Sequence, residues 1–258
     1  MAETAGRERT AELVEAVVAG LGDVVRRHRV TEAEWYGALE FIGRVARADE
    51  LVLLSDVLGL SVLVDRQAHA GAERAGTPSN VLGPFWRPAP PIPNPGALAG
   101  DDDPGEPLIV RGTVSAVDGT PIPGARVDLW QCDADGRYDV QLGDGTEPRY
   151  RGVLTTDARG RYEVRTVVPP PYEVPKDGPV GELLARLGRH AFRPAHIHYR
   201  VDAEGRAPLT TMMFLAGDPW LGNDTIGADR PELTVPIDRT TSPPTARFDI
   251  ALDPGAGT

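Results

Sequence analysis

The segment from Arg193 to Tyr199 holds the residues best suited to chemistry, because it contains two histidines separated by one residue. On a β-strand, side chains two residues apart point to the same face, so His196 and His198 would present both imidazoles to one site. Such a pair suits zinc, copper or iron. An arbitrary His-x-His pair is more often an ordinary pair of core or surface histidines. Two observations favour a metal here: the chain has only five histidines, and an imidazole inside an apolar strand is costly without a partner.

The remaining ligands of such a metal are not obvious from residue types. The sequence has no cysteine cluster and no His-x-x-Glu or Glu-x-x-His arrangement that would complete a zinc site. Two tyrosines are candidates: Tyr138 follows the turn at Asp135-Gly136, and Tyr172 lies in the proline-rich loop 169–175. A tyrosine in such a loop usually packs its ring and leaves its hydroxyl in water. The residues alone therefore suggest a metal site without completing it.

Helices are predicted for the N-terminal part of the chain. Apolar residues recur at helical spacing from about Thr10 to Ala68, which predicts three helices. Thr31 and Glu34 form a capping box at the start of the second. The third, over 50–68, is apolar on most of its circumference, so we expect it to contact its own domain and a second surface, such as another subunit.

Short strands are predicted after a proline-rich connector at 83–95, which can be neither helix nor central strand. Alternating apolar residues bounded by turn residues predict strands at 108–114, 125–131, 161–167, 196–201, 209–215 and 246–250. Many short strands with Gly/Pro-rich turns indicate a β-sandwich or barrel. We therefore predict an α+β, mainly β protein: a helical N-terminal domain (1–82), a Pro-rich linker (83–106) and a C-terminal β-sandwich (107–258).

An ordered set of motifs resembles the intradiol ring-cleaving dioxygenases, which include catechol, chlorocatechol and hydroxyquinol 1,2-dioxygenases and protocatechuate 3,4-dioxygenase. The set is specific because it keeps its order over most of the chain. The matching segments are 54–59, 81–86, 128–131, 136–138, 171–175, 188–190 and 193–198. Segments 31–35 and 54–65 look more like the hydroxyquinol and chlorocatechol branch than the plain catechol branch.

The resemblance implies one Fe(III) ion per chain, held by Tyr138, Tyr172, His196 and His198 with a hydroxide at the free site. A free tyrosine has a pKa of about 10, but a trivalent cation replaces its proton. Two phenolates and a hydroxide balance three positive charges, whereas the two-histidine, one-carboxylate triad is the usual Fe(II) arrangement. By analogy, the substrate would chelate the iron through both oxygens and displace the hydroxide and Tyr172. Both atoms of O₂ would enter a cis,cis-muconate or maleylacetate-type product.

Other site residues also follow from the resemblance. Arg193 matches an arginine near the substrate, where a fixed cation stabilises charge developing on the ring. Met212 departs from the pattern, because many relatives have Gln or His there as a polar group that tunes the site. Asp65 could bind a third ring hydroxyl, or it could be a helix-surface carboxylate. The apolar wall of the substrate pocket is assigned by family position to Val81, Leu82, Pro84 and Phe85.

Composition limits the partners and the compartment. The formal net charge of −11 argues against nucleic acid and against an anionic membrane surface. Cys132 is the only cysteine, so no internal disulfide can form. With no apolar leader at the N-terminus, we expect a cytoplasmic protein. The resemblance implies that 107–258 is the catalytic domain and that 1–82 is the dimerisation domain. It adds a homodimer joined by its helices, with phospholipid at the interface.

Two other functions are weighed against the dioxygenase. Residues 119–127 also resemble the opening of transthyretin-like and other Ig-like β-sandwich domains, which bind ligands without catalysis. That module would explain the sandwich but not four placed N/O ligands. A zinc hydrolase built on His196 and His198 lacks a carboxylate or third histidine at a natural spacing.

Overall fold

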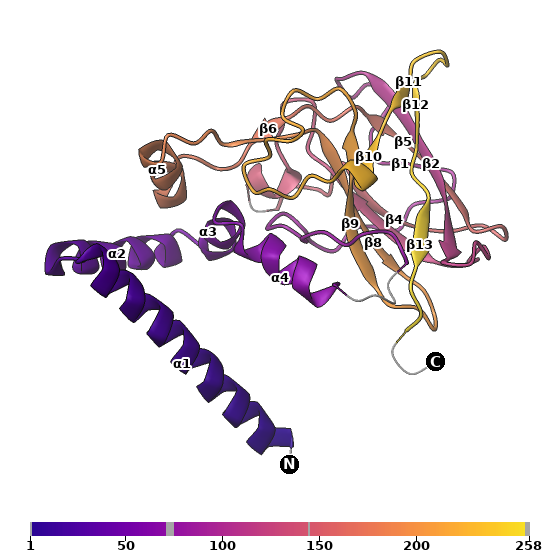
Figure 1. Ribbon diagram of the computed structural model, residues 1–258. Helices are drawn as coiled ribbons and strands as arrows, with labels where there is room; N and C mark the ends of the chain where they lie inside the picture. The colour runs from indigo at the N-terminus through magenta and orange to yellow at the C-terminus, as the bar shows by residue number, and fades with distance from the viewer. Residues whose placement is uncertain (1, 71–74, 144, 256–258) are drawn as a thin grey trace. The chain divides into compact units, whose positions relative to one another are not determined.

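A computed structural model describes residues 2–70, 75–143 and 145–255. The chain forms two compact units, one ending at Asp49 and the other beginning at Glu50. The first unit holds α1 (Ala2–His28) and α2 (Glu32–Arg47) (Figure 1). The predicted capping box is confirmed, since Glu34 N–H donates to the Thr31 hydroxyl at 3.3 Å and Thr31 N–H donates to the Glu34 carboxylate at 2.8 Å.

The second unit begins with two short helices, where the sequence predicted one. α3 (Leu51–Val57) and α4 (Leu60–Ala68) are separated at Gly59, which has φ +73°. Glycine adopts this left-handed conformation without steric cost, and the continuous apolar pattern concealed the break. The prediction of a single helix over 50–68 was therefore wrong.

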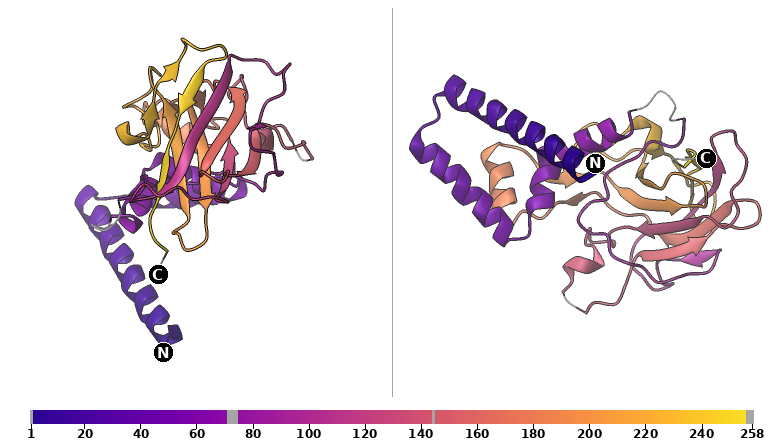
Figure 2. Two further views of the ribbon diagram at one scale, coloured as in Figure 1. Left: turned by 90° about the vertical axis from the view of Figure 1, so that its right-hand side faces the viewer. Right: turned by 90° about the horizontal axis from the view of Figure 1, so that it is seen from below.

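Two sheets form the body of the second unit, in separate layers (Figures 1 and 2). The first sheet has the order β1 (Gly96–Ala97), β5 (Arg161–Val167), β2 (Pro107–Ala116), β12 (Thr245–Arg247) and β11 (Ile237–Asp238), and β13 (Ile250–Leu252) also pairs with β2. The second has the order β10 (Thr234–Val235), β9 (Leu209–Leu215), β8 (His196–Asp202), β3 (Arg126–Trp130) and β4 (Arg151–Thr155). Tyr162 of the first sheet meets Tyr199 of the second edge to face, with ring centroids 6.1 Å apart. The predicted β-sandwich, with helices before it, is confirmed.

Smaller elements lie between the strands. They are η1 (Asp139–Gln141), the antiparallel pair of β6 (Tyr172–Glu173) and β7 (Phe192–Arg193), α5 (Pro179–Arg186) between those two strands, and η2 (Pro231–Leu233). None of the helices among the described residues is both long and apolar enough to cross a bilayer. The predicted domain limits at residues 82 and 106 stay predictions.

Most strand predictions match the structure. The strands at 161–167 and 209–215 have the predicted limits. The strand predicted at 246–250 is instead two strands, β12 and β13, which pair with successive parts of β2. Between them, the Asp249 carboxylate accepts the Thr113 N–H at 2.9 Å and so replaces a sheet hydrogen bond. β4 was not predicted.

Candidate metal centre

Strand β8 places His196 and His198 in the middle of the second sheet. His198 is paired with Trp130 on β3 and with Met212 on β9, so it has a strand on either side. His196 and His198 are 1% and 2% exposed, and their Nε2 atoms are 3.2 Å apart. The two-residue period of the strand accounts for this convergence.

The two tyrosines reach the histidines from loops. Tyr138 directly precedes η1, and its hydroxyl lies 3.4 Å from His196 Nε2. Tyr172 on β6 meets the Tyr138 ring edge to face, with centroids 5.4 Å apart. Both tyrosines are buried. The structure therefore brings all four residues predicted as ligands into one group.

Gly136 sets the spacing of the two tyrosine segments. Its φ is +80°, and a Cβ there would lie 2.9 Å from the Cβ of Tyr172. Such a contact is too short for two carbon atoms, so the close approach of the two segments requires glycine.

Protonation states follow from burial. His196 Nδ1 lies 2.7 Å from the Pro194 carbonyl, which can only accept, so Nδ1 carries the hydrogen and Nε2 keeps its lone pair. Burial, with Arg193 nearby, lowers the pKa of His196 to about 3, and burial also holds the pKa of His198 well below its usual value. Burial raises the pKa of both Tyr138 and Tyr172. Both imidazoles are therefore neutral, and the phenols would lose their protons only to a strong cation.

The donor set can be compared with what metals require. Two phenol oxygens and two imidazole nitrogens converge at the group, with no carboxylate among them. Among the residues that the structure describes, no three or more His, Cys, Asp or Glu side chains form a metal-binding cluster. A zinc hydrolase would need a carboxylate or a third histidine beside His196 and His198. Hard anionic oxygens with imidazoles instead fit a ferric ion.

Arg193 is fixed beside the ligand group by Asp224. Its Nε and Nη2 donate to the two Asp224 carboxylate oxygens at 3.2 and 3.1 Å. Its Nη1 lies 3.5 Å from the Tyr172 hydroxyl and 3.2 Å from His196 Nε2. Asp224 also accepts the N–H groups of Ile226 and Ala228. This buried ion pair holds a positive charge against the site, but no sequence motif identified Asp224.

A cavity of about 770 Å³ is lined by residues of α3, α4 and the segment 80–83, and none of the four predicted ligands lines it. Val81, Leu82 and Asp65, all predicted as pocket residues, line it together with Gly83. A Cβ at Gly83 would lie 3.5 Å from His198 Cε1, so this glycine of the cavity wall also contacts the ligand group.

Three other predicted pocket residues do not line this cavity. Phe85 stacks on Tyr138 at 4.6 Å and 24°, and Pro84 is exposed. Met212 is fully buried, and its sulfur accepts from Arg193 Nη2 at 3.5 Å. Phe85 therefore contacts the predicted ligand Tyr138, Met212 contacts Arg193, and Pro84 faces the solvent.

Two carboxylates line the cavity. Asp65 accepts from the Ser79 hydroxyl at 3.0 Å and lies 3.1 Å from His69 Nδ1. Asp56 on α3 is 3% exposed, and burial raises its pKa. Sequence reasoning missed Asp56, although a single acid within the apolar run 51–58 is a signal that could have found it.

Comparison with known proteins identifies the class. Residues 82–254 match the family model described as Dioxygenase, and residues 7–76 match the one described as Catechol dioxygenase N terminus. The chain is 39% identical over 252 residues to the 6-chlorohydroxyquinol 1,2-dioxygenase of Cupriavidus pinatubonensis, covering 95% of this chain and 91% of that one. It is 41% identical over 226 residues to the hydroxyquinol 1,2-dioxygenase of a Rhizobium species, covering 84% and 76% respectively.

A solved structure of a 1,2-dioxygenase is similar to this chain in fold and sequence. The 3-chlorocatechol 1,2-dioxygenase of Rhodococcus opacus 1CP has a TM-score of 0.87 and 32% identity, with 96% of this chain and 100% of that chain covered. Fold and similarity thus define an oxidoreductase that cleaves aromatic rings with O₂. The chain belongs to the intradiol ring-cleaving dioxygenase family. The predicted family and enzyme class are confirmed, in preference to a non-catalytic binding module.

Proposed function

We propose that the protein is an Fe(III)-dependent intradiol 1,2-dioxygenase acting on hydroxyquinol or a chlorinated relative. The observation that carries this proposal is the convergence of two tyrosine hydroxyls and two histidine Nε2 atoms in a buried group without a carboxylate. Tyr138, Tyr172, His196 and His198 would hold one ferric ion per chain. When bound, that ion supplies the Lewis acidity that holds the substrate as a catecholate and makes its ring reactive toward O₂.

The chain's own residues would handle the substrate's protons. Tyr172 is the group proposed to leave its position when the substrate binds, and burial raises its pKa. On leaving, it would accept a proton from a ring hydroxyl. Arg193, fixed by Asp224 and 3.5 Å from the Tyr172 hydroxyl, would stabilise negative charge at that oxygen and on the ring. Burial of the group excludes water.

The choice of substrate rests on the cavity and the relatives. Val81 and Leu82 provide an apolar wall for an aromatic ring, and Asp56 and Asp65 provide carboxylates. A carboxylate in such a cavity can accept a hydrogen bond from a third ring hydroxyl. The relatives' names include hydroxyquinols and chlorocatechols.

Measurements of oxygen uptake would test which substrate is used and which carboxylate, Asp56 or Asp65, binds the third ring hydroxyl. Asp56→Asn and Asp65→Asn should be compared on hydroxyquinol and catechol. The variant at the residue that binds the third hydroxyl should lose roughly tenfold or more in kcat/KM on hydroxyquinol only. Equal losses on both substrates, or none, would contradict this role.

Iron content and colour test the function itself. Protein expressed with ample iron should contain about one iron per chain and be reddish from tyrosinate-to-iron charge transfer. Tyr138→Phe and His198→Ala should lose colour, iron and activity together. Tyr150→Phe is a matched control, because Tyr150 is buried in a separate apolar cluster with Ala99 and Val167. Colourless, iron-free wild-type protein would contradict the proposal.

We also infer a cytoplasmic homodimer joined through the first unit, with phospholipid at the interface. Large apolar side chains on α1 and α2 are about half exposed within a single chain. A face of this kind usually marks an association surface. Organic extraction with mass spectrometry would detect the lipid, and its absence from purified dimer would contradict that part.

A further inference from the structure

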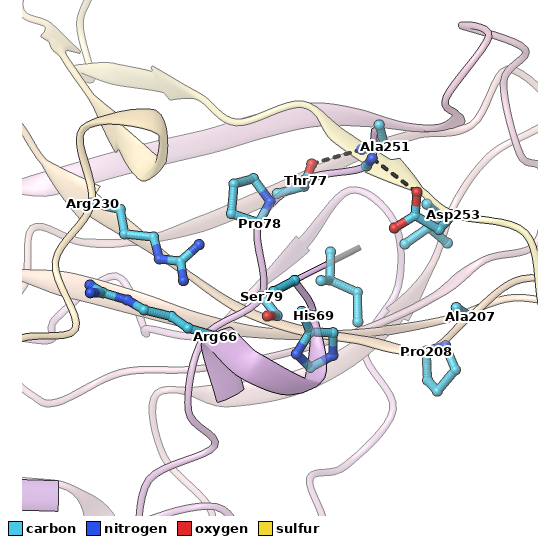
Figure 3. A pocket seen from close by; sticks show the side chains of 14 residues that line it. Arg66, His69, Thr77, Pro78, Ser79, Ala207, Pro208, Arg230, Ala251 and Asp253 are labelled. Carbon is cyan, nitrogen blue, oxygen red and sulfur yellow. Dashed lines mark hydrogen bonds between the residues drawn. The ribbon is translucent and has the colours of Figure 1, made fainter. Parts of the chain in front are cut away.

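A second cavity, of about 290 Å³, lies next to the first in the second unit. It is bounded by the C-terminal part of α4, residues 76–79, the start of β9 and the end of β13 (Figure 3). His69 and Pro208 line both cavities and form their common wall. The two cavities are therefore neighbours.

Positive charge is concentrated in the smaller cavity. Figure 3 shows Arg66 of α4 and Arg230 of the loop before η2 on the same side of it. Among the described residues, neither guanidinium pairs with a carboxylate. The hydrogen bond found for Arg66 goes to the Gly227 carbonyl, at 3.2 Å. In a protein with a net charge of −11, two such arginines in one cavity indicate a site for an anion.

The other polar groups in the wall do not satisfy these arginines. The Asp253 carboxylate accepts the N–H groups of Ala75 and Gly76 at 3.1 and 3.0 Å. The Thr77 hydroxyl accepts the Ala251 N–H at 2.9 Å, which leaves its own hydrogen to donate. His69 Nδ1 lies 3.1 Å from an Asp65 oxygen, which leaves Nε2 for a ligand.

We propose that this cavity binds a small organic dicarboxylate, the class to which the ring-cleavage product belongs. The identity of the product rests on the proposed function. Ring cleavage converts a neutral diol into a diacid, and carboxylic acids with pKa values of about 4 are ionised at neutral pH. Two carboxylates then match two guanidinium groups, which bind carboxylates through paired hydrogen bonds. The cavity would receive the product beside the chamber in which it forms.

Calorimetric titration of the iron-loaded protein with cis,cis-muconate tests the proposal. The double variant Arg66→Gln/Arg230→Gln should bind muconate about tenfold or more weakly than the wild type. Arg159→Gln is the matched control, since Arg159 is an exposed arginine outside both cavities, and it should bind as the wild type does. Dimethyl muconate has the same carbon chain without the charges, so its affinity should be the same for the wild type and the double variant.

Equal muconate affinity in the wild type and the double variant would overturn the proposal, because binding would then lie elsewhere, such as at the metal centre. Arginine-dependent binding of inorganic phosphate without binding of muconate would also overturn it, in favour of a phosphate site. These titrations are scored without turnover. Failure of the proposed function would appear separately, as protein without iron or oxygen uptake.

Discussion

The two histidines of the candidate metal centre are held in different ways. His196 donates from Nδ1 to the Pro194 carbonyl, whereas His198 Nδ1 is buried without a hydrogen-bond partner among the described residues. Histidine ligands usually donate their second N–H to a carbonyl, carboxylate or water. The His198 ring instead lies flat on Trp130, with centroids 4.7 Å apart and an angle of 10°. Stacking on Trp130 therefore sets the plane of His198.

Replacing Trp130 should loosen the metal. We expect Trp130→Leu to weaken iron binding by about 10–100-fold, the range for lost outer partners of a ligand, and to shift the visible charge-transfer band. Trp130→Phe keeps a flat ring and should retain more of the iron and the band. Iron analysis and absorption spectra provide the measurement. Identical spectra and iron content in the Leu and Phe variants would mean that stacking does not orient His198.

Asp56 makes stability depend on pH. Burial raises its pKa above the ordinary 3.8, so the folded state disfavours the carboxylate form. This destabilisation is absent below 3.8 and sets in as the pH rises through the raised value. Asp56→Asn should therefore have a higher Tm than the wild type at pH 7, and the difference should shrink as the pH falls toward 3.8. A difference that stays constant in melting curves over this range would show that Asp56 is not the cause.

The site was only partly predictable from residue types. His196 and His198 follow from strand geometry, because a two-residue period fixes both side chains on one face. Tyr138 and Tyr172 lie on loops that only the folded chain brings together, so their assignment needed the family resemblance. Asp224, which fixes Arg193, has no motif, and its contact with Arg193 spans 31 residues of sequence.

At the scale of elements, a buried ion pair fixes the segment that carries Tyr138. Asp139 begins η1, and its carboxylate accepts from Arg151 Nε on β4 at 2.7 Å and from Arg87 Nη2 at 2.7 Å. The Asp139 and Arg151 side chains are each 1% exposed. Burial raises the pKa of Asp139, but the hydrogen bonds from Arg151 and Arg87 outweigh this effect. The pKa of Asp139 therefore lies below its ordinary value. The pair therefore ties η1 to the sheet and to the linker.

Breaking this pair should be costly. Asp139→Asn leaves Arg151 buried without its counter-charge, which typically costs about 3–5 kcal/mol. We expect this loss in the free energy of unfolding measured in urea, together with reduced iron content because Tyr138 moves. Asp101→Asn removes the partner of Arg165 at an exposed pair and should cost little. Similar losses in both variants would contradict the role of Asp139.

Strands with strict alternation, such as β5 and β9, could be predicted with their limits, because their pattern and their pairing agree. β4 could not, since its sequence Arg-Gly-Val-Leu-Thr begins with a charge and a glycine. Arg151 is buried there only because Asp139 neutralises it across the fold. The break at Gly59 was missed for a similar reason: a glycine within an apolar run can continue a helix or end it.

At the scale of the whole molecule, association should depend on α1. Val17 and Leu21 are 59% and 49% exposed in a single chain. In a twofold interface, the double variant Val17→Glu/Leu21→Glu would place two negative charges from each subunit at the contact. This repulsion should cost several kcal/mol in the free energy of association. Sedimentation should show a dimer for the wild type and a monomer for this variant. Glu15→Gln, a change in charge at another exposed position of α1, should remain dimeric. A wild-type monomer at micromolar concentration would contradict the dimer.

Gly136 has a consequence for how this enzyme tolerates change. It has no side chain, yet its backbone sets how closely the two tyrosine segments approach. In a library that randomises residues 135–137, we expect Asp135 and Arg137, both exposed, to accept many replacements. At position 136, even alanine would push Tyr172 away from Tyr138. The loss of every side chain at position 136 would therefore show how close the hydroxyl oxygens of Tyr138 and Tyr172 must lie, although neither tyrosine is randomised.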